Sequence, residues 1–475
     1  MNNKIKGFIQ NFSYTFLANI LSIIISTVLI FIVPGFIGVD DYGYWQLYIF
    51  YSSYISYMSL GLTDGAYLRF GGYEYSDLNK PVFVSQYWFL VLFDIVVNMS
   101  IFLFYASISA DTSKTMVVLL TCLTGIFVVP RSLLTFMLQA TNRIKEYSII
   151  LMIERIIYFI IVIIFLLKGI RQFEYLIYAD IFGKVCSVIY SFFVCRGLVF
   201  GKFASVKFSI REIMLNVSVG SKLLLANFAS MLIIGIVRLS IEKNWDIGTF
   251  GKVSLTLSIS NILMLFINAI AVVLFPTLRR TSKENLPAIY KTMSTIIVIP
   301  LLGLLMFYFP VKIILSSWLP QYAESLNYMA LLFPMCLYEG KTNLLINTYL
   351  KTLRKERFML VTNLITVGIS IILTFINVYI INNLNITILS IILLLAFRSI
   401  VAELYLSKVL NIYVMKDIIF ELCMTIIFIF TSWFLDMFVA IFVYFVIYVL
   451  YLAIKKKEII NLVKSIKLIL KSNHN

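Results

Sequence analysis

The chain has 475 residues, of which 61% are hydrophobic and 13% are charged, and its mean hydropathy is +0.97. A soluble domain is nearer half apolar and a quarter charged, so this composition excludes a soluble globular protein. The formal net charge of +16 does not indicate a nucleic-acid partner, because the basic residues lie between apolar segments along the whole chain.

Apolar segments that are long enough to cross a hydrocarbon core of roughly 30 Å recur along the whole chain. The first follows Lys4 and Lys6. It is too long for the apolar region of a cleavable signal peptide and lacks a small-residue cleavage site, so we expect it to be the first span. In chain order the predicted spans are 13–33, 42–64, 82–104, 115–138, 148–167, 175–195, 215–240, 254–275, 292–315, 325–350, 358–380, 386–407, 417–435 and 437–454.

The basic residues between these spans alternate strictly in number. The gaps on one side of the membrane, together with both termini, hold 26 lysines and arginines, whereas the gaps on the other side hold five. The positive-inside rule assigns the richer side to the cytoplasm. We therefore expect both termini to be cytoplasmic. The alternation also supports the number of spans, since one missed helix would scramble every later gap.

Residues for catalysis or metal binding are scarce in this sequence. The single histidine, His474, is one residue from the end, and none of the five cysteines has a CxxC partner. We expect free, buried thiols with neither disulfides nor a metal site. No nucleotide-binding P-loop is present, which argues against direct ATP-driven transport. The sequence predicts that the protein is not an enzyme and holds no cofactor.

A weak internal sequence repeat divides the chain into two parts. Leu17-Ala18-Asn19 in the first span is followed by Asp41-Tyr42-Gly43, and Leu225-Ala226-Asn227 in the seventh span is followed by Asp246-Ile247-Gly248. The repeat lies in the first two and in the seventh and eighth spans, as expected for two bundles of six spans each. Transporters commonly consist of two repeated bundles with the substrate path between them.

These observations predict an all-α polytopic membrane protein of about 14 transmembrane helices. We expect two six-helix bundles around a central cavity, over 1–200 and 201–410, and two additional helices over 411–454. Residues 455–475 form a basic tail with apolar residues at helical spacing, which predicts an amphipathic helix on the anionic cytoplasmic leaflet. The alternative is a solvated tail that only fixes the topology.

Eight basic residues lie inside the predicted spans or at their ends. Arg155, Arg238 and Lys312 are near span ends and can extend to the interface. A charge at a helix centre costs roughly 2.5–3.5 kcal/mol on insertion scales, so deeper cations persist where they face a wet cavity or a partner. The five informative residues, our candidates for substrate binding, are Arg131, Lys184, Lys222, Lys341 and Arg398.

All of these cations except Lys184 are on the order of 10–15 Å from the cytoplasmic ends of their spans, at 1.5 Å per residue. This common depth predicts a basic vestibule that is open to the cytoplasm. The alternative is structural ion pairing, which is strongest for Lys184 because Asp180 precedes it by four residues on the same helix face. Arg131 and Lys222 have no acidic neighbour in sequence, so they are the leading candidates for substrate contact.

Acidic residues within the spans have two interpretations. Arg398 has Glu403 five residues on, and Lys341 has Glu339 two residues before, but neither pair shares a helix face. The deep carboxylates are candidates for a coupling proton or sodium ion, with a packing role as the alternative. These ion-coupling candidates are Asp94, Glu154, Asp180 and Glu339.

Deep cations that are reachable from the cytoplasm suit a diphosphate. Arginine presents a planar fork to phosphate oxygens, and lysine presents a movable point charge. A lipid-linked sugar diphosphate has an apolar tail that can stay in the bilayer and a polar head that must cross it. An acidic sugar would also fit a basic cleft.

The end of the second span carries Gly61-Leu62-Thr63-Asp64-Gly65-Ala66-Tyr67-Leu68-Arg69-Phe70-Gly71-Gly72, and its beginning carries Tyr42-Gly43-Tyr44-Trp45-Gln46. These segments resemble the polysaccharide flippases of the Wzx type. That family is the polysaccharide branch of the multidrug/oligosaccharidyl-lipid/polysaccharide exporter superfamily, whose fold is MATE- and MurJ-like. Length, span number and the two-bundle plan extend the resemblance over the whole chain, although its recognisable residues lie in the first 72.

The resemblance implies translocation of undecaprenyl-diphosphate-linked oligosaccharide units across the bacterial inner membrane. It implies ion-coupled alternating access, for O-antigen or capsular polysaccharide synthesis. Expected partners are the lipid-linked oligosaccharide, membrane lipids, and a polymerase and chain-length regulator of the same pathway. Asp64 and Arg69 would form a cytoplasmic gate, or alternatively a structural turn rich in glycine.

Two other functions remain open from the sequence. A membrane glycosyltransferase would use an acidic residue in the first outer loop, which holds Asp40 and Asp41, although the outer loops are too short to enclose an acceptor. A multidrug exporter of the same superfamily would favour acidic and aromatic cavities over deep lysine and arginine.

Overall fold

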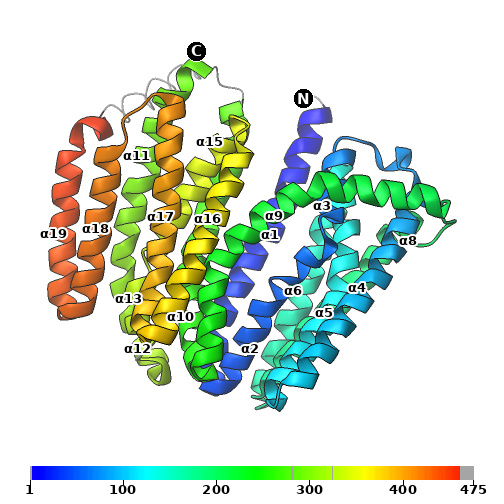
Figure 1. The fold of residues 1–475 in the computed structure, drawn as a ribbon, viewed down its shortest axis with the longest axis horizontal. Helices are drawn as coiled ribbons and strands as arrows, with labels where there is room; N and C mark the ends of the chain where they lie inside the picture. The colour runs from blue at the N-terminus through cyan, green and yellow to red at the C-terminus, as the bar shows by residue number, and fades with distance from the viewer. Residues whose placement is uncertain (1–2, 280–282, 324, 461–475) are drawn as a thin grey trace. The chain divides into compact units, whose positions relative to one another are not determined.

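The computed structural model describes residues 3–279, 283–323 and 325–460. Within these ranges the chain is almost entirely helical and contains no strand, as Figure 1 shows. Eleven helices in the described part are long and apolar enough to cross a membrane. The predicted fold class, an all-α polytopic membrane protein, is confirmed.

The chain forms two compact units, which are described separately. Unit 1 comprises Met1–Phe228 together with Ile247–Gly251, and unit 2 comprises Ala229–Asp246 together with Lys252–Asn475. The helices of unit 1 are α1 (Asn3–Phe36), α2 (Val39–Ser52), η1 (Ile55–Ser59), α3 (Leu62–Phe70), η2 (Tyr75–Asp77), α4 (Lys80–Ile108), α5 (Thr112–Ala140), α6 (Ile144–Leu167), α7 (Phe173–Val194), α8 (Arg196–Val199) and the first part of α9 (Val206–Asn244). The predicted repeat boundaries at 200, 410 and 454 stay predictions.

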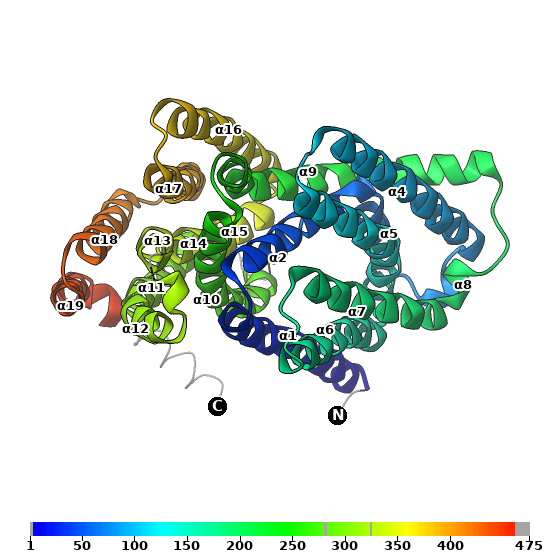
Figure 2. The ribbon, with the colours of Figure 1, turned by 90° about the horizontal axis from the view of Figure 1, so that it is seen from below.

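Helix α5 is the central helix of unit 1. In its most apolar stretch 67% of the residues are buried, against 17% in α4. Figure 2 shows α4 and α5 from below. The buried face of α5 includes Thr121, Thr124 and Gly125, small residues that let neighbouring helices approach closely.

The second predicted span, 42–64, is interrupted in the structure. Helix α2 ends at Ser52, the short 3₁₀ helix η1 follows, and α3 begins at Leu62. The cause is the backbone at Leu60 and Gly61, whose φ angles are 52° and 86°. This left-handed conformation ends a right-handed helix, and glycine adopts it at little cost.

Glycines allow close backbone contact between α3 and the first part of α9. A Cβ on Gly61 would lie 2.6 Å from the Ser221 nitrogen, and one on Gly65 would overlap the Asn216 carbonyl. Gly61 directly precedes α3 and Gly65 lies in its first turn, and small residues at such positions let helices pack closely in membranes. Two of the repeated segments also meet in unit 1, since a Cβ on Gly43 would overlap the Ile247 carbonyl.

Unit 2 contains the second part of α9 and the helices that follow it. Helix α17 is its central helix, with 56% of its most apolar stretch buried, against 17% in α19. The helices are α10 (Ile247–Arg279), η3 (Lys283–Asn285), α11 (Leu286–Leu304), η4 (Leu305–Phe307), α12 (Tyr308–Trp318), η5 (Pro320–Tyr322), α13 (Ser325–Leu332), α14 (Met335–Lys341), η6 (Thr342–Ile346), α15 (Asn347–Thr352), α16 (Glu356–Phe375), η7 (Ile376–Ile380), α17 (Leu384–Leu410), α18 (Met415–Phe434) and α19 (Met437–Ile454).

The tenth predicted span, 325–350, is also interrupted. Helix α13 ends before Pro334, which cannot donate the hydrogen bond that would continue the helix. After α14 the backbone forms the π-helical turn η6, and α15 completes the segment. A π turn of this kind holds one residue more than an α-helical turn.

Every predicted span corresponds to a helical segment of the described chain. Eleven are long apolar helices, and the other three are α10 and the two interrupted segments. All five cysteines are free, but Cys423 is exposed and Cys186 is partly exposed, so the prediction that all are buried is wrong for these two. Cys186 lies on α7 and Cys423 on α18, and neither is on the buried face of its helix. Most of the predicted amphipathic tail, from residue 461 on, lies outside the described residues.

Candidate functional site

Arg131 has an acidic partner that sequence proximity does not reveal. In unit 1 its guanidinium donates to the Glu154 carboxylate on α6 and to the Ser187 hydroxyl on α7. The Arg131 and Glu154 side chains are only 9% and 8% exposed. The Nε of Arg131 is buried without a hydrogen-bond partner, so one donor of the fork remains unused.

The predicted Lys184–Asp180 pair is present on α7. Asp180 also accepts a hydrogen bond from the Tyr48 hydroxyl on α2, at 2.5 Å, and Tyr48 lies 2.9 Å from the Thr124 hydroxyl on α5. Arg131, Glu154, Asp180 and Lys184 thus belong to one polar region within four helices of unit 1. Arg155 lies close enough to act electrostatically on Glu154 as well.

Asp94 is fully buried on α4 and has no cationic partner in the described chain. Its Oδ1 accepts from Asn98 Nδ2 at 2.9 Å. Its Oδ2 and the Asn98 Oδ1 are both buried without a partner. Both unpaired atoms are acceptors while Asp94 is ionised, and protonation of Asp94 would turn its Oδ2 into a donor.

Lys222 is the candidate cation that the structure leaves exposed. It lies on the part of α9 that belongs to unit 1, and no ion pair or hydrogen bond of its side chain is found among the described residues. Of the five candidate cations, Lys222 therefore has the side chain most available to a ligand.

Asp64 and Arg69, the predicted gate residues, do not pair with each other. Arg69 binds Glu212 at 2.8 Å and the Asn216 side-chain oxygen at 2.6 Å, both on α9. Asn216 in turn donates to Gln86 on α4 at 3.1 Å. The structure thus assigns Arg69 to the contact that holds α3 against α9, whereas Asp64 is half-buried on α3 and forms no ion pair within the described ranges.

In unit 2, Arg398 on α17 pairs with Glu339 on α14. The distance is 2.6 Å, and Arg398 also donates to the Ser230 hydroxyl at 2.8 Å. Glu339 accepts a second hydrogen bond from Asn343 at 3.0 Å. As in the case of Arg131, the arginine has a glutamate and a serine as partners and a buried Nε without one.

Lys341 lies between two carboxylates. Its Nζ is 2.6 Å from Glu403 on α17 and 2.6 Å from Glu421 on α18. The side chains of Lys341 and Glu403 are 0% and 1% exposed, so solvent does not reach them. The two glutamates thus exchange partners relative to the sequence. Glu403, the sequence neighbour of Arg398, pairs with Lys341, and Glu339, the sequence neighbour of Lys341, pairs with Arg398.

Sequence reasoning missed Glu421 as part of this site. It occupies the thirteenth span, whose predicted role was only that of an additional helix. A carboxylate inside an apolar span is the feature that could have identified it. Among the described residues, no group of three histidine, cysteine, aspartate or glutamate side chains is arranged to hold a metal ion.

Comparisons with known proteins identify the fold. No protein-family model and no curated protein matches the chain. Among solved structures, the lipid II flippase MurJ in an inward closed conformation matches with a TM-score of 0.67 and 13% identity, over 95% of this chain and 100% of that chain. An inward-facing multidrug resistance MATE family transporter of the MOP superfamily matches with a TM-score of 0.64 and 10% identity, over 83% of this chain and 98% of that chain.

The chain is therefore a multi-pass membrane protein with the fold shared by MATE transporters and MurJ. At 10–13% identity the likeness establishes the fold alone.

Proposed function

We propose that the protein is a flippase that carries a lipid-linked oligosaccharide diphosphate from the cytoplasmic to the outer leaflet of a bacterial inner membrane. The units would serve O-antigen or capsular polysaccharide synthesis, and an ion gradient would drive alternating access. The observation that carries this proposal is the match to MurJ, which extends over almost the full length of both chains. The MATE match leaves a larger part of this chain uncovered.

The side chains refine how a diphosphate would be held. Lys222 is exposed and has no side-chain partner among the residues that the structure describes, so it can bind phosphate without breaking a pair seen there. Arg131 and Arg398 are each paired with a glutamate but retain an unused Nε donor. A diphosphate could compete for these arginines, because a phosphate offers the same bidentate geometry as a carboxylate. Lys184 and Lys341 are held by carboxylates and would contribute mainly to the local potential.

A contact of Asp41 weighs against the glycosyltransferase alternative. Its Oδ1 accepts a hydrogen bond from the Phe173 backbone nitrogen at 3.0 Å. Phe173 is the first residue of α7, so Asp41 satisfies a free amide at that helix N-terminus. This structural role explains one of the two acidic residues in the first outer loop without catalysis. The multidrug-exporter alternative has the MATE likeness in its favour and is separated by the experiment below.

The test is deletion of the gene in its host, followed by location of the lipid-linked repeat unit in the two leaflets. We expect accumulation on the cytoplasmic leaflet and loss of surface polymer. Complementation with Lys222→Ala should fail although the variant is stably expressed. Lys207→Ala, which removes an exposed lysine from the same helix α9, should restore the polymer.

Two other outcomes would contradict the proposal. An incomplete glycan that lacks one sugar would establish a transferase. Normal surface polymer together with increased sensitivity to cationic drugs would establish a multidrug exporter.

A further inference from the structure

A buried charge cluster in unit 2 holds its cation between two carboxylates. Lys341, Glu403 and Glu421, which we name the Lys341 cluster, join α14, α17 and α18. Lys341 Nζ binds Glu403 Oε2 at 2.6 Å and the two oxygens of Glu421 at 2.6 and 2.8 Å. The Glu421 side chain is 5% exposed.

One cation faces two carboxylates in this cluster. When all three groups are ionised, the cluster carries one uncompensated negative charge. Such a charge is costly in an apolar interior, where an ionisable group tends to be paired or neutralised. Within the described ranges no second cation bonds to either carboxylate, and the remaining bond of Glu403 is the one that its Oε1 accepts from the neutral Tyr290 hydroxyl at 3.0 Å. The titratable groups around Glu421 are Lys341 and Tyr338 of α14, Glu403 of α17, Tyr290 of α11, Asp417 of its own helix, and Tyr451 and Lys455 at the end of α19.

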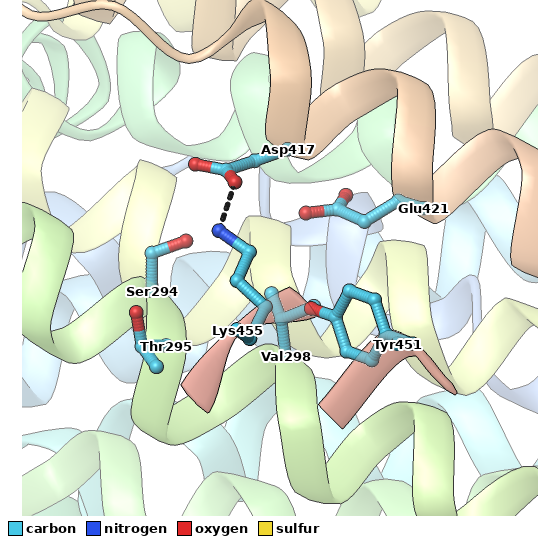
Figure 3. A pocket seen from close by; sticks show the side chains of 7 residues that line it. All are labelled: Ser294, Thr295, Val298, Asp417, Glu421, Tyr451 and Lys455. Atoms are coloured by element: carbon cyan, nitrogen blue, oxygen red, sulfur yellow. Dashed lines mark hydrogen bonds and ion pairs between the residues drawn. The ribbon is translucent and has the colours of Figure 1, made fainter. Parts of the chain in front are cut away.

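A small pocket connects Glu421 with the end of α19 at which Lys455 lies. Figure 3 shows the seven residues that line it, from α11, α18 and the end of α19. Its volume of about 10 Å³ is close to the minimum that holds one water molecule. Ser294 is 8% exposed and points its hydroxyl into this space (Figure 3). No hydrogen bond of that hydroxyl is found in the described part of the chain, so it can bind a water molecule there.

Lys455 occupies the outer end of the pocket. Its Nζ binds Asp417, as Figure 3 shows, and Glu458 at 2.7 Å. Burial opposes its charge, but the hydrogen bonds to Asp417 and Glu458 outweigh burial and raise the pKa of Lys455. Lys455 therefore stays charged and binds Asp417. Of the two carboxylates that line the pocket, Glu421 is the one that Lys455 does not bind.

We propose that the Lys341 cluster is a proton-binding site. It exchanges protons through this pocket with the water on the side of the membrane where Lys455 lies. A hydronium ion gives one proton to a carboxylate oxygen of Glu421, an O–H bond forms there, and a water molecule remains in the pocket. Lys341 keeps its proton and its contact with Glu403. The loaded cluster is neutral and the unloaded cluster carries one negative charge.

The proton load would alter how firmly α14, α17 and α18 are held together. In the unloaded state Lys341 binds both carboxylates, whereas in the loaded state the neutral Glu421 binds it more weakly. Use of this proton to drive transport rests on the proposed function, but the binding itself does not.

The experiment is infrared difference spectroscopy of the full-length protein in lipid nanodiscs between about pH 5 and pH 9. The Asp94→Asn background removes a buried acid of unit 1 that has no cationic partner in the described chain. We expect a carboxylic-acid C=O band that titrates with pH, shifts on ¹³C-glutamate labelling, and is lost in Glu421→Gln. Glu458→Gln, which removes an exposed carboxylate that binds Lys455 but does not line the pocket, should retain the band.

The labelling experiment needs no cluster variant, so its negative outcome overturns the proposal even where Glu421→Gln fails to fold. Absence of a glutamate-derived band overturns the proposal, as does a band that persists unchanged in folded Glu421→Gln. A spectral change that follows sodium concentration at constant pH would assign the site to a metal cation instead. The measurement uses no substrate, so failure of flipping in Lys222→Ala leaves its outcome unaffected.

Discussion

Replacement of Lys341 by methionine tests whether the buried cluster stabilises unit 2. Methionine has a similar length to lysine but carries no charge, so it leaves Glu403 and Glu421 facing each other without the cation that binds both. Removal of one partner from a buried ion pair costs about 3–5 kcal/mol. We expect a loss in that range, because Lys341 is fully buried and water cannot replace it.

The free energy of unfolding can be measured by titration of the purified protein with SDS in mixed micelles. Lys457→Met is the matched control, since Lys457 is exposed, and it should change the stability by no more than about 0.5 kcal/mol. The triple variant Lys341→Met/Glu403→Gln/Glu421→Gln should recover most of the loss, because it removes the uncompensated carboxylates. The reasoning is refuted if Lys341→Met unfolds like the wild type, or if the triple variant is no more stable than the single one.

Two further predictions concern unit 1. Gly65→Ala should destabilise the protein by at least about 1–3 kcal/mol, since its Cβ would overlap the Asn216 backbone. The control Gly368→Ala, whose Cβ would have no atom within 4 Å, should be neutral or stabilising by up to about 1 kcal/mol. Equal effects of the two substitutions on thermal unfolding would contradict the close contact at Gly65. Arg131→Gln should cost about 3–5 kcal/mol by leaving Glu154 buried without a cation, and Arg131→Gln/Glu154→Gln should recover more than half of it in the SDS titration; a double variant that is less stable than the single one would disprove the pairing.

The positions of the spans could be predicted well, because each requires only a local run of apolar residues. The strict alternation of basic gaps added a constraint on their number. The breaks in two spans were not predicted. Pro334 and Gly61 stand in the sequence as possible break points, but an apolar run has the same composition whether its helix is continuous or not.

Ion-pair partners could be predicted only within one helix. Lys184 and Asp180 are four residues apart, so helical geometry alone brings them together. Arg131 and Glu154 lie on consecutive helices, and their contact depends on how those helices are rotated about their axes. Neither apolar periodicity nor charge counting determines that rotation. The same reason separates Lys341 from its sequence neighbour Glu339.

The availability of Lys222 also required the structure. Arg131 and Lys222 were equivalent from the sequence, since neither has an acidic neighbour there. The structure distinguishes them because Arg131 faces other helices of unit 1, whereas Lys222 is exposed on α9.

The π turn at Thr342–Ile346 changes how this segment must be compared with other sequences. One extra residue in a helical turn rotates everything after it by about 100°. Beyond the turn, the Tyr349 hydroxyl donates to the Leu286 carbonyl at 3.2 Å, and its ring meets that of Tyr290 at 5.1 Å. Deletion of one residue from the turn would restore an α-helix and move Tyr349 away from both. An alignment with an uninterrupted helix therefore needs a one-residue gap in this turn, and a helical wheel drawn across it assigns the later residues to the wrong face.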